Sequence, residues 1–356
     1  MKINNFSAGP SKIPIEVLST IAEDINNYKD LGYSVLEISH RSKVFENIVN
    51  TAKKKLVDIL KIPDDYDIFF IQGGATFQNT FIPANKKSLS SNVSFLISGT
   101  WGRKTHEDFE TYFGKKISNF TLNDIGFQNI EKYTNNLDEE YLYLTSNETI
   151  EGIQIRDFHL FNNKKLIIDM SSDICSYEFD WTNLSYVYAG AQKNLGIPGV
   201  TICIVKKGFV EESDQTSYLN INNHISKNSS FNTPPTFSIY VLLKILDWVL
   251  DAGGINEIQK NNFKRASRIY DFLDLHNEHF NLVAPVDLRS YSNIVFDFKD
   301  SSKTEKFLND CIARGFIGLN GHRSVGGVRV SNYNSITDEM VSDFLNTLND
   351  FISLDK

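Results

Sequence analysis

Short apolar segments rich in β-branched and aromatic residues alternate with longer segments of helical period between about residues 34 and 207. Several of the short segments are apolar on both alternating faces, as expected of strands that are covered on two sides. The pattern predicts an α/β fold whose buried, mostly parallel sheet is flanked by helices. The strands expected in this sheet span residues 67–72, 92–98, 141–145, 165–169, 185–189 and 200–206.

Two helices are expected to pack on this sheet. Residues 43–61 carry one apolar stripe with lysines opposite and stop before Pro63. A second helix is predicted to start near Thr236, just after two prolines, and to end at Gly253-Gly254. The chain beyond these glycines predicts helices at 255–279, 303–314 and 337–352 and strands at 293–298 and 328–331. We therefore expect a large α/β domain, residues 14–254, and a small α+β domain, residues 1–13 with 255–356.

Charge and cysteine content exclude several classes of protein. The 356 residues carry a formal charge of −8, from 36 basic and 44 acidic side chains, which disfavours binding to nucleic acid or to anionic membranes. The three cysteines show no C-x-x-C spacing, which argues against a disulfide framework and a structural zinc site. Residues 1–12 have no signal-peptide core, and no segment approaches the length of a membrane span. We expect a cytoplasmic protein.

Lys193 is the first candidate for chemistry. It is the only charged residue between Asp180 and Lys206 and lies among small residues between two predicted core strands. Desolvation in such a setting lowers the pKa of an amine, and a neutral amine can form a Schiff base with an aldehyde or ketone. The alternative is a solvated lysine in a turn.

Two further features follow predicted strands, at the edge where open α/β sheets bind ligands. Gly73-Gly74-Ala75-Thr76 follows a predicted strand and opens a helical pattern, which suits a phosphate held by backbone N–H groups, although a tight turn explains the glycines equally well. Asp169 closes another strand and could pair with a protonated ring nitrogen or simply cap a turn. A reactive lysine, this aspartate and a phosphate cradle are together the parts of a pyridoxal phosphate (PLP) site.

Cationic side chains suggest a substrate with two anionic groups. His40-Arg41 and His322-Arg323 could bind a phosphate, and Arg329 could hold a carboxylate through two hydrogen bonds. For each of these basic groups, the alternative is an ion pair with a nearby acidic residue at the protein surface. Trp101, on a glycine-flanked turn after a strand, is either a stacking surface for a flat cofactor or a core aromatic residue.

These segments resemble the phosphoserine aminotransferase family, in the class V branch of the fold-type I PLP-dependent enzymes. The resemblance runs nearly end to end. The segments that carry it most specifically are Tyr188-Ala189-Gly190-Ala191-Gln192-Lys193-Asn194, Phe231-Asn232-Thr233-Pro234-Pro235-Thr236 and Gly321-His322-Arg323-Ser324-Val325-Gly326-Gly327-Val328-Arg329-Val330-Ser331. It implies a seven-stranded sheet in the large domain.

The resemblance also implies roles for individual residues. Lys193 matches the Schiff-base lysine and Asp169 the partner of the ring nitrogen, the two catalytic positions. The other cofactor contacts implied are Ala75, Thr76, Trp101, Thr149 and Gln192, with Asn232 and Thr233 reaching the phosphate from the second subunit of a homodimer. The substrate contacts implied are Ser7, His40, Arg41, His322, Arg323 and Arg329. No metal is implied.

The reaction implied is reversible transfer of the amino group of L-glutamate to 3-phosphohydroxypyruvate, which gives O-phospho-L-serine and 2-oxoglutarate in serine biosynthesis. The resemblance also allows formation of 4-phosphohydroxy-L-threonine for pyridoxine synthesis. Thr76 stands where some relatives place an arginine, which leaves substrate affinity open. A cysteine desulfurase, another class V aminotransferase and a catalytically silent binding protein are the competing hypotheses; a desulfurase needs a cysteine on a mobile loop, a feature missing from the sequence.

Overall fold

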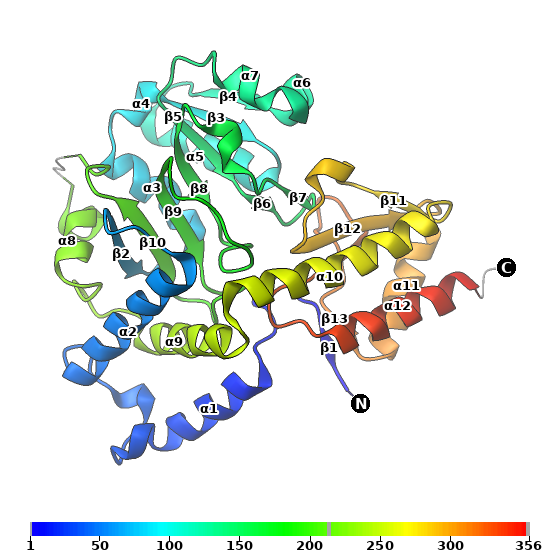
Figure 1. The fold of residues 1–356 in the computed structure, drawn as a ribbon, viewed down its shortest axis with the longest axis horizontal. Coiled ribbons are helices and arrows are strands. Elements are labelled where there is room, and N and C mark those ends of the chain that lie inside the picture. The colour runs from blue at the N-terminus through cyan, green and yellow to red at the C-terminus, as the bar shows by residue number, and fades with distance from the viewer. Residues whose placement is uncertain (1, 212–214, 354–356) are drawn as a thin grey trace.

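The computed structural model describes residues 2–211 and 215–353; Met1 and residues 212–214 and 354–356, which the predicted domain ranges include, lie outside the described residues. Figure 1 shows a twisted sheet with helices on both faces, and beside it a smaller group of strands and helices. The long helix α10 (Gly254–Leu275) runs from one group to the other. The predicted α/β class is confirmed.

The large sheet has seven strands and is mostly parallel, as expected. Strand β10 is antiparallel to both of its neighbours, β2 and β9, and the remaining pairs are parallel. In spatial order the strands are β2 (Tyr66–Ile71), β10 (Thr201–Lys206), β9 (Leu184–Gly190), β8 (Lys165–Asp169), β5 (Tyr141–Thr145), β3 (Val93–Ile97) and β4 (Ser118–Thr121).

Side chains of this sheet alternate between two hydrophobic cores, which explains the apolar runs in the sequence. One core holds Leu142 and Leu144 together with helices α2 (Lys43–Leu60) and α9 (Thr236–Asp251). The other core holds Tyr143, with α3 (Gly74–Asn85) and α5 (Thr100–Phe113). The two helices predicted to pack on this sheet, now α2 and α9, are confirmed to within about two residues at each end.

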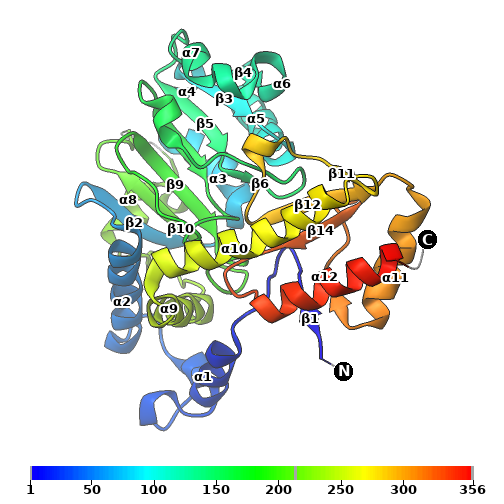
Figure 2. The same ribbon diagram turned by 45° about the vertical axis from the view of Figure 1, so that its right-hand side comes forward.

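The smaller group is built on a three-stranded antiparallel sheet with its own core (Figure 2). Phe6 from the N-terminal segment packs into this core, and β1 pairs in parallel with β13. The elements are β1 (Asn4–Asn5), β11 (Phe280–Leu282), β12 (Asn293–Phe298), β13 (Phe316–Ile317), β14 (Val328–Ser331), α11 (Ser302–Ala313) and α12 (Asp338–Ser353). Strands predicted at 293–298 and 328–331 are therefore confirmed.

Two local predictions were wrong, and one strand of the large sheet was missed. The strand β4 was missed, because its polar residues give it no apolar run at the edge of the sheet. The helix predicted over 255–279 ends at Leu275, and β11 starts at Phe280, because the chain turns there to pair with β12. Trp101 does not lie on a turn: it is in the first turn of α5.

Short elements complete the chain. They are α1 (Ile15–Asn26), α4 (Leu89–Asn92), α6 (Leu122–Ile125), α7 (Ile130–Thr134), α8 (Ile221–Ser226), β6 (Asn147–Glu148) and β7 (Ile153–Gln154). Within residues 2–211 and 215–353, no helix is both long and apolar enough to cross a membrane, and no cluster of three or more His, Cys, Asp or Glu could hold a metal ion.

Candidate active site

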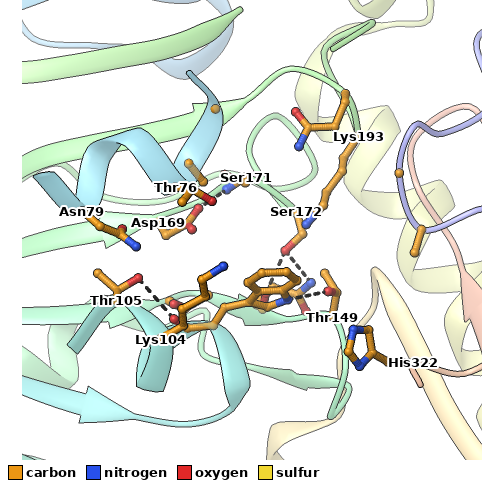
Figure 3. A pocket seen from close by; sticks show the side chains of 18 of the residues that line it. Thr76, Asn79, Lys104, Thr105, Thr149, Asp169, Ser171, Ser172, Lys193 and His322 are labelled. Atoms are coloured by element: carbon orange, nitrogen blue, oxygen red, sulfur yellow. Dashed lines mark hydrogen bonds between the residues drawn. The ribbon is translucent and has the colours of Figure 1, made fainter. Parts of the chain in front are cut away.

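A cavity of about 400 Å³ opens at the carboxyl edge of the large sheet, next to the small sheet. Nine of the residues predicted to bind cofactor or substrate line it: Ala75, Thr76, Trp101, Thr149, Asp169, Gln192, Lys193, His322 and Arg329. Figure 3 shows Asp169, at the end of β8, and Lys193, on a loop, entering this space, with Thr76 beside Asp169. This edge is where open α/β sheets bind ligands.

Lys193 lies in the connection between β9 and β10, as predicted. Its backbone is fixed by the N-terminal segment, since the Ser11 N–H donates to the carbonyl of Gln192 at 2.9 Å and the Ser11 hydroxyl donates to the carbonyl of Lys193. The next side chain, Asn194, donates to the carbonyl of Ile174 at 3.1 Å. Burial lowers the pKa of the Lys193 amine, against the opposing effect of the Asp169 charge. The amine therefore loses its proton, and becomes nucleophilic, more readily than a solvated lysine.

Asp169 is the last residue of β8 and is buried at the edge of the cavity. Its Oδ1 accepts the Ser171 N–H at 2.8 Å, which fixes the carboxylate. Burial raises the pKa of Asp169, while the hydrogen bonds from Ser171 and the charge of Lys193 lower it. A dehydrated carboxylate of this kind gains strongly from a cationic partner in the cavity.

The Gly73–Thr76 segment forms the strand-to-helix turn that the sequence predicts. Gly73 (φ +111°) and Gly74 (φ +66°) both have left-handed backbone conformations, and α3 begins at Gly74. A Cβ atom on Gly73 would lie 2.5 Å from the Cβ of Phe77, so only glycine fits there. Gly74, Ala75 and Thr76 line the cavity with the first turn of α3, where backbone N–H groups have no carbonyl one turn earlier. This turn can hold an anion.

Trp101 and Arg329 meet at Thr149. The indole Nε1 of Trp101 donates to Thr149 Oγ1 at 3.0 Å, and Arg329 Nη1 donates to the Thr149 carbonyl at 3.2 Å. Burial lowers the pKa of the Arg329 guanidinium. His322, which also lines the cavity, contacts Ser324 Oγ through Nδ1 at 2.7 Å. The aromatic ring of Trp101 and the desolvated guanidinium of Arg329 therefore line the same cavity.

The remaining predicted site residues do not line this cavity within one chain. Ser7 and Arg323 are each adjacent in sequence to a residue that does. His40 and Arg41 lie just before α2, and Arg41 is exposed. Asn232 and Thr233 are exposed and bond to Gln72: Asn232 Nδ2 donates to its Oε1 at 3.3 Å, and the carbonyl of Thr233 accepts from its Nε2 at 3.2 Å.

Several residues that line the cavity have no individual role predicted from the sequence. These are Ala8, Gly9, Asn79, Lys104, Thr105, Thr145, Asn147, Ser171 and Ser172. Helical spacing could have found three of them, because Asn79 is three residues after Thr76, and Lys104 and Thr105 are three and four residues after Trp101. The others reach the cavity through tertiary packing.

The cavity residues fit PLP. A desolvated lysine and a desolvated aspartate share one space, as an aldehyde cofactor with a basic ring nitrogen requires. A Cβ built on Gly74 meets nothing within 4 Å, so the start of α3 leaves open space for a phosphate. Trp101 offers an aromatic surface beside it. Lys193, Asp169 and the start of α3 would hold the cofactor.

Cysteine chemistry does not fit this cavity. Cys175, Cys203 and Cys311 are all buried, and none of them lines the cavity. Burial raises the pKa of each thiol to about 12. The desulfurase hypothesis therefore lacks its nucleophile.

This chain resembles known proteins over nearly its whole length. The model of the aminotransferase class V family matches residues 3–344. A phosphoserine aminotransferase from Lysinibacillus sphaericus is 39% identical over 349 residues, which cover 96% of each chain. The solved phosphoserine aminotransferase from Bacillus circulans subsp. alkalophilus is 35% identical, with a TM-score of 0.94 and coverage of 100% of this chain and 99% of that chain. The PLP-bound phosphoserine aminotransferase from Trichomonas vaginalis is 30% identical, with a TM-score of 0.89, covering 98% and 100%.

Proposed function

Since this chain belongs to the phosphoserine aminotransferases of aminotransferase class V, we propose that the cavity around Lys193 is its active site. The activity is PLP-dependent phosphoserine transamination, a step of serine biosynthesis. The observation that carries the site assignment is that Lys193, from the connection between β9 and β10, and Asp169, from the end of β8, enter one cavity.

The two catalytic residues divide the proton chemistry. When bound, the cofactor supplies an aldehyde carbon for amines and a ring that withdraws the electron pair left at the substrate Cα. The Lys193 amine, with its lowered pKa, would take the proton from the substrate Cα and deliver it to the carbon that had been the cofactor's aldehyde carbon, and the second half-reaction would run this transfer in reverse. The Asp169 carboxylate keeps the ring nitrogen protonated, and its bond from Ser171 fixes its direction.

Anionic groups of both substrates are bound by this chain's cations. Arg329 holds the α-carboxylate, because its guanidinium reaches the cavity beside Thr149. His322 and Arg323 bind the distal anion, which is a carboxylate in L-glutamate and a phosphate in 3-phosphohydroxypyruvate. Thr76 and the backbone at the start of α3 hold the cofactor phosphate. Thr149 positions the Trp101 ring on the face of the cofactor.

A homodimer completes the proposed site. Asn232 and Thr233 lie outside the cavity of their own chain, so their predicted contact with the phosphate requires a second copy, and the same holds for His40 and Arg41. Light scattering should give twice the chain mass. Mixing a Lys193→Ala chain with an Asn232→Ala/Thr233→Ala chain should restore activity, because one site of each hybrid is intact; mixtures that stay as weak as either parent would contradict sharing.

Three other predictions stand beside the site. We propose domains of residues 14–254 and of 1–13 with 255–356, supported by the separate core of the smaller group, which contains Phe6 and residues between Ala266 and Ile352. Cytoplasmic location is supported by the three free cysteines. Formation of 4-phosphohydroxy-L-threonine stays a prediction of the family resemblance.

The deciding assay mixes the holoenzyme with L-glutamate and 3-phosphohydroxypyruvate and follows O-phospho-L-serine. Lys193→Ala should abolish product formation and the visible absorption of the bound cofactor. Lys53→Ala is the matched control, since burial also lowers the pKa of Lys53, to about 8, but its amine bonds to Asn228 outside the cavity. Undiminished turnover by Lys193→Ala would refute the assigned catalyst.

A further inference from the structure

Helix α5 begins without a cap of its own. Gly99 precedes it and provides no side-chain hydrogen bond, and the first turn contains no acidic residue. Its second residue, Trp101, forms part of the cavity wall. The first-turn N–H groups of a buried helix must find acceptors elsewhere, or the helix start is destabilised.

Two glutamates from the segment after β5 supply these acceptors. Glu151 Oε1 accepts the backbone N–H of Thr100 at 2.9 Å and its hydroxyl at 2.5 Å. Glu148 Oε2 accepts the N–H of Trp101 at 2.9 Å, and its Oε1 accepts the N–H of Gly102 at 2.7 Å. Glu148 is fully buried, so its bonds are made without competition from water.

The contact is tight enough to restrict the neighbouring residues. A Cβ on Gly99 would lie 2.6 Å from Cγ of Glu148 and 2.7 Å from its Cδ, and a Cβ on Gly102 would lie 3.2 Å from its Oε1. Thr149, the residue after Glu148, accepts the indole N–H of Trp101. Consecutive residues of one segment therefore hold both the backbone and the ring of Trp101.

We propose that Glu148 is a positioning residue for cofactor binding: its carboxylate fixes the backbone of Trp101, and Trp101 in turn presents its ring to the cofactor. The inference rests on the proposed function for the placement of PLP beside Trp101. Glu148 touches neither cofactor nor substrate, because its two oxygens are occupied by backbone N–H groups and it does not line the cavity. Loss of its bonds frees the helix start to shift and tilts the indole.

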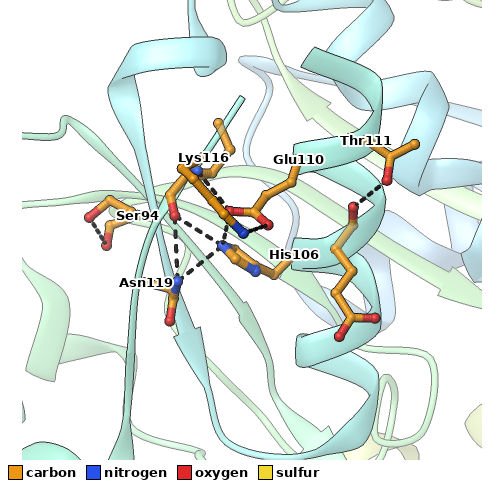
Figure 4. A network of polar contacts seen from close by, with 9 residues as sticks. Ser94, His106, Glu110, Thr111, Lys116 and Asn119 are labelled. Carbon is orange, nitrogen blue, oxygen red and sulfur yellow. Dashed lines mark hydrogen bonds and ion pairs between the residues drawn. The ribbon is translucent and has the colours of Figure 1, made fainter. Parts of the chain in front are cut away.

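The test compares holoenzymes carrying Glu148→Gln, Trp101→Ala, both changes, and Glu110→Gln. Glutamine keeps the size of Glu148 but turns an NH₂ group toward one of the two N–H donors. Glu110 is the matched control: it lies toward the other end of α5 (Figure 4), accepts the Ile117 N–H at 3.1 Å and does not line the cavity. The measurements are PLP affinity by absorbance titration and the visible circular dichroism of bound PLP.

Glu148→Gln should weaken PLP binding roughly tenfold, the effect of losing one hydrogen bond, and shift the visible dichroism toward that of Trp101→Ala. The double variant should bind PLP no more weakly than Trp101→Ala alone, because Glu148 acts through Trp101. Glu110→Gln should have the same PLP affinity and the same visible dichroism as the wild type. If Glu148→Gln does not fold, Gly102→Ala crowds the same carboxylate and should produce the same spectral change.

Two results would overturn the inference while leaving the proposed function intact. One is a Glu148→Gln holoenzyme with wild-type affinity and dichroism alongside a clear effect of Trp101→Ala. The other is full additivity in the double variant, which would show that Glu148 acts independently of Trp101. If Trp101→Ala itself changes neither measurement, the placement of the cofactor against Trp101 fails, and the inference fails with it.

Discussion

The ionisation of Glu148 should make the stability of this protein fall as the pH rises from about 5 to 8. Burial raises the pKa of Glu148 from its ordinary value of 4.5 to about 8, with the Gly102 and Trp101 N–H groups opposing the shift and the charge of Glu151 adding to it. The folded protein therefore retains a proton that the unfolded chain has released. Folding is favoured by this proton below pH 4.5, and the advantage is lost as the pH rises through 8.

The size of this change in stability follows from the interval between the pKa of Glu148 in the unfolded chain and its pKa in the folded protein. One extra proton on the folded state changes the free energy of unfolding by about 1.4 kcal/mol per pH unit, or on the order of 5 kcal/mol over the whole interval. Glu148→Gln carries no such proton. Asp169 and Asp173, whose pKa values burial also raises, are present in both proteins, so their contributions cancel in the comparison.

The assay is urea unfolding of wild-type and Glu148→Gln holoenzyme between pH 5 and 8. The stability advantage of the wild type over the variant should shrink steadily as the pH rises. Glu110→Gln serves as control, because hydrogen bonding to Lys116 lowers the pKa of Glu110 and confines its titration to acid. Parallel curves for wild type and Glu148→Gln across this range would refute the reasoning.

Other changes should have equally specific effects. Arg329→Lys should raise the KM for both amino-acid substrates roughly tenfold or more, with a smaller change in kcat, since a lysine cannot make two parallel bonds to a carboxylate; steady-state kinetics with glutamate and phosphoserine check this. Gly152→Ala should lower the free energy of unfolding, measured with urea, by about 1–3 kcal/mol, because φ is +70° and the new Cβ would lie 3.0 Å from the Asn293 carbonyl oxygen. Leu246→Ala, in the buried face of α9, should cost about 2–5 kcal/mol by the same measurement. The Cys175 thiol, whose pKa burial raises to about 12, should resist an aromatic disulfide reagent at pH 8 until the protein is unfolded.

Local patterns in the sequence predicted most of the fold. Strands such as 141–145 and 165–169 are apolar on both faces because both faces are buried, and this is visible without any partner strand. The helix at Lys43–Leu60 follows from its stripe and from the proline beyond it. By contrast, β4 is polar and lies at the sheet edge, so its pairing with β3 leaves no mark in its own residues.

The sequence by itself determined the chemical groups of the site: a lone lysine among small residues, an aspartate closing a strand and a glycine turn before a helix. Only the tertiary structure decided that these groups share one cavity, and that Glu148 holds Trp101 from 47 residues away. The physical reason is the distance along the chain over which each effect acts. Strand and helix patterns arise between near neighbours in the chain, whereas the burial that shifts the pKa values of Lys193, Asp169 and Glu148 exists only once distant segments have packed together.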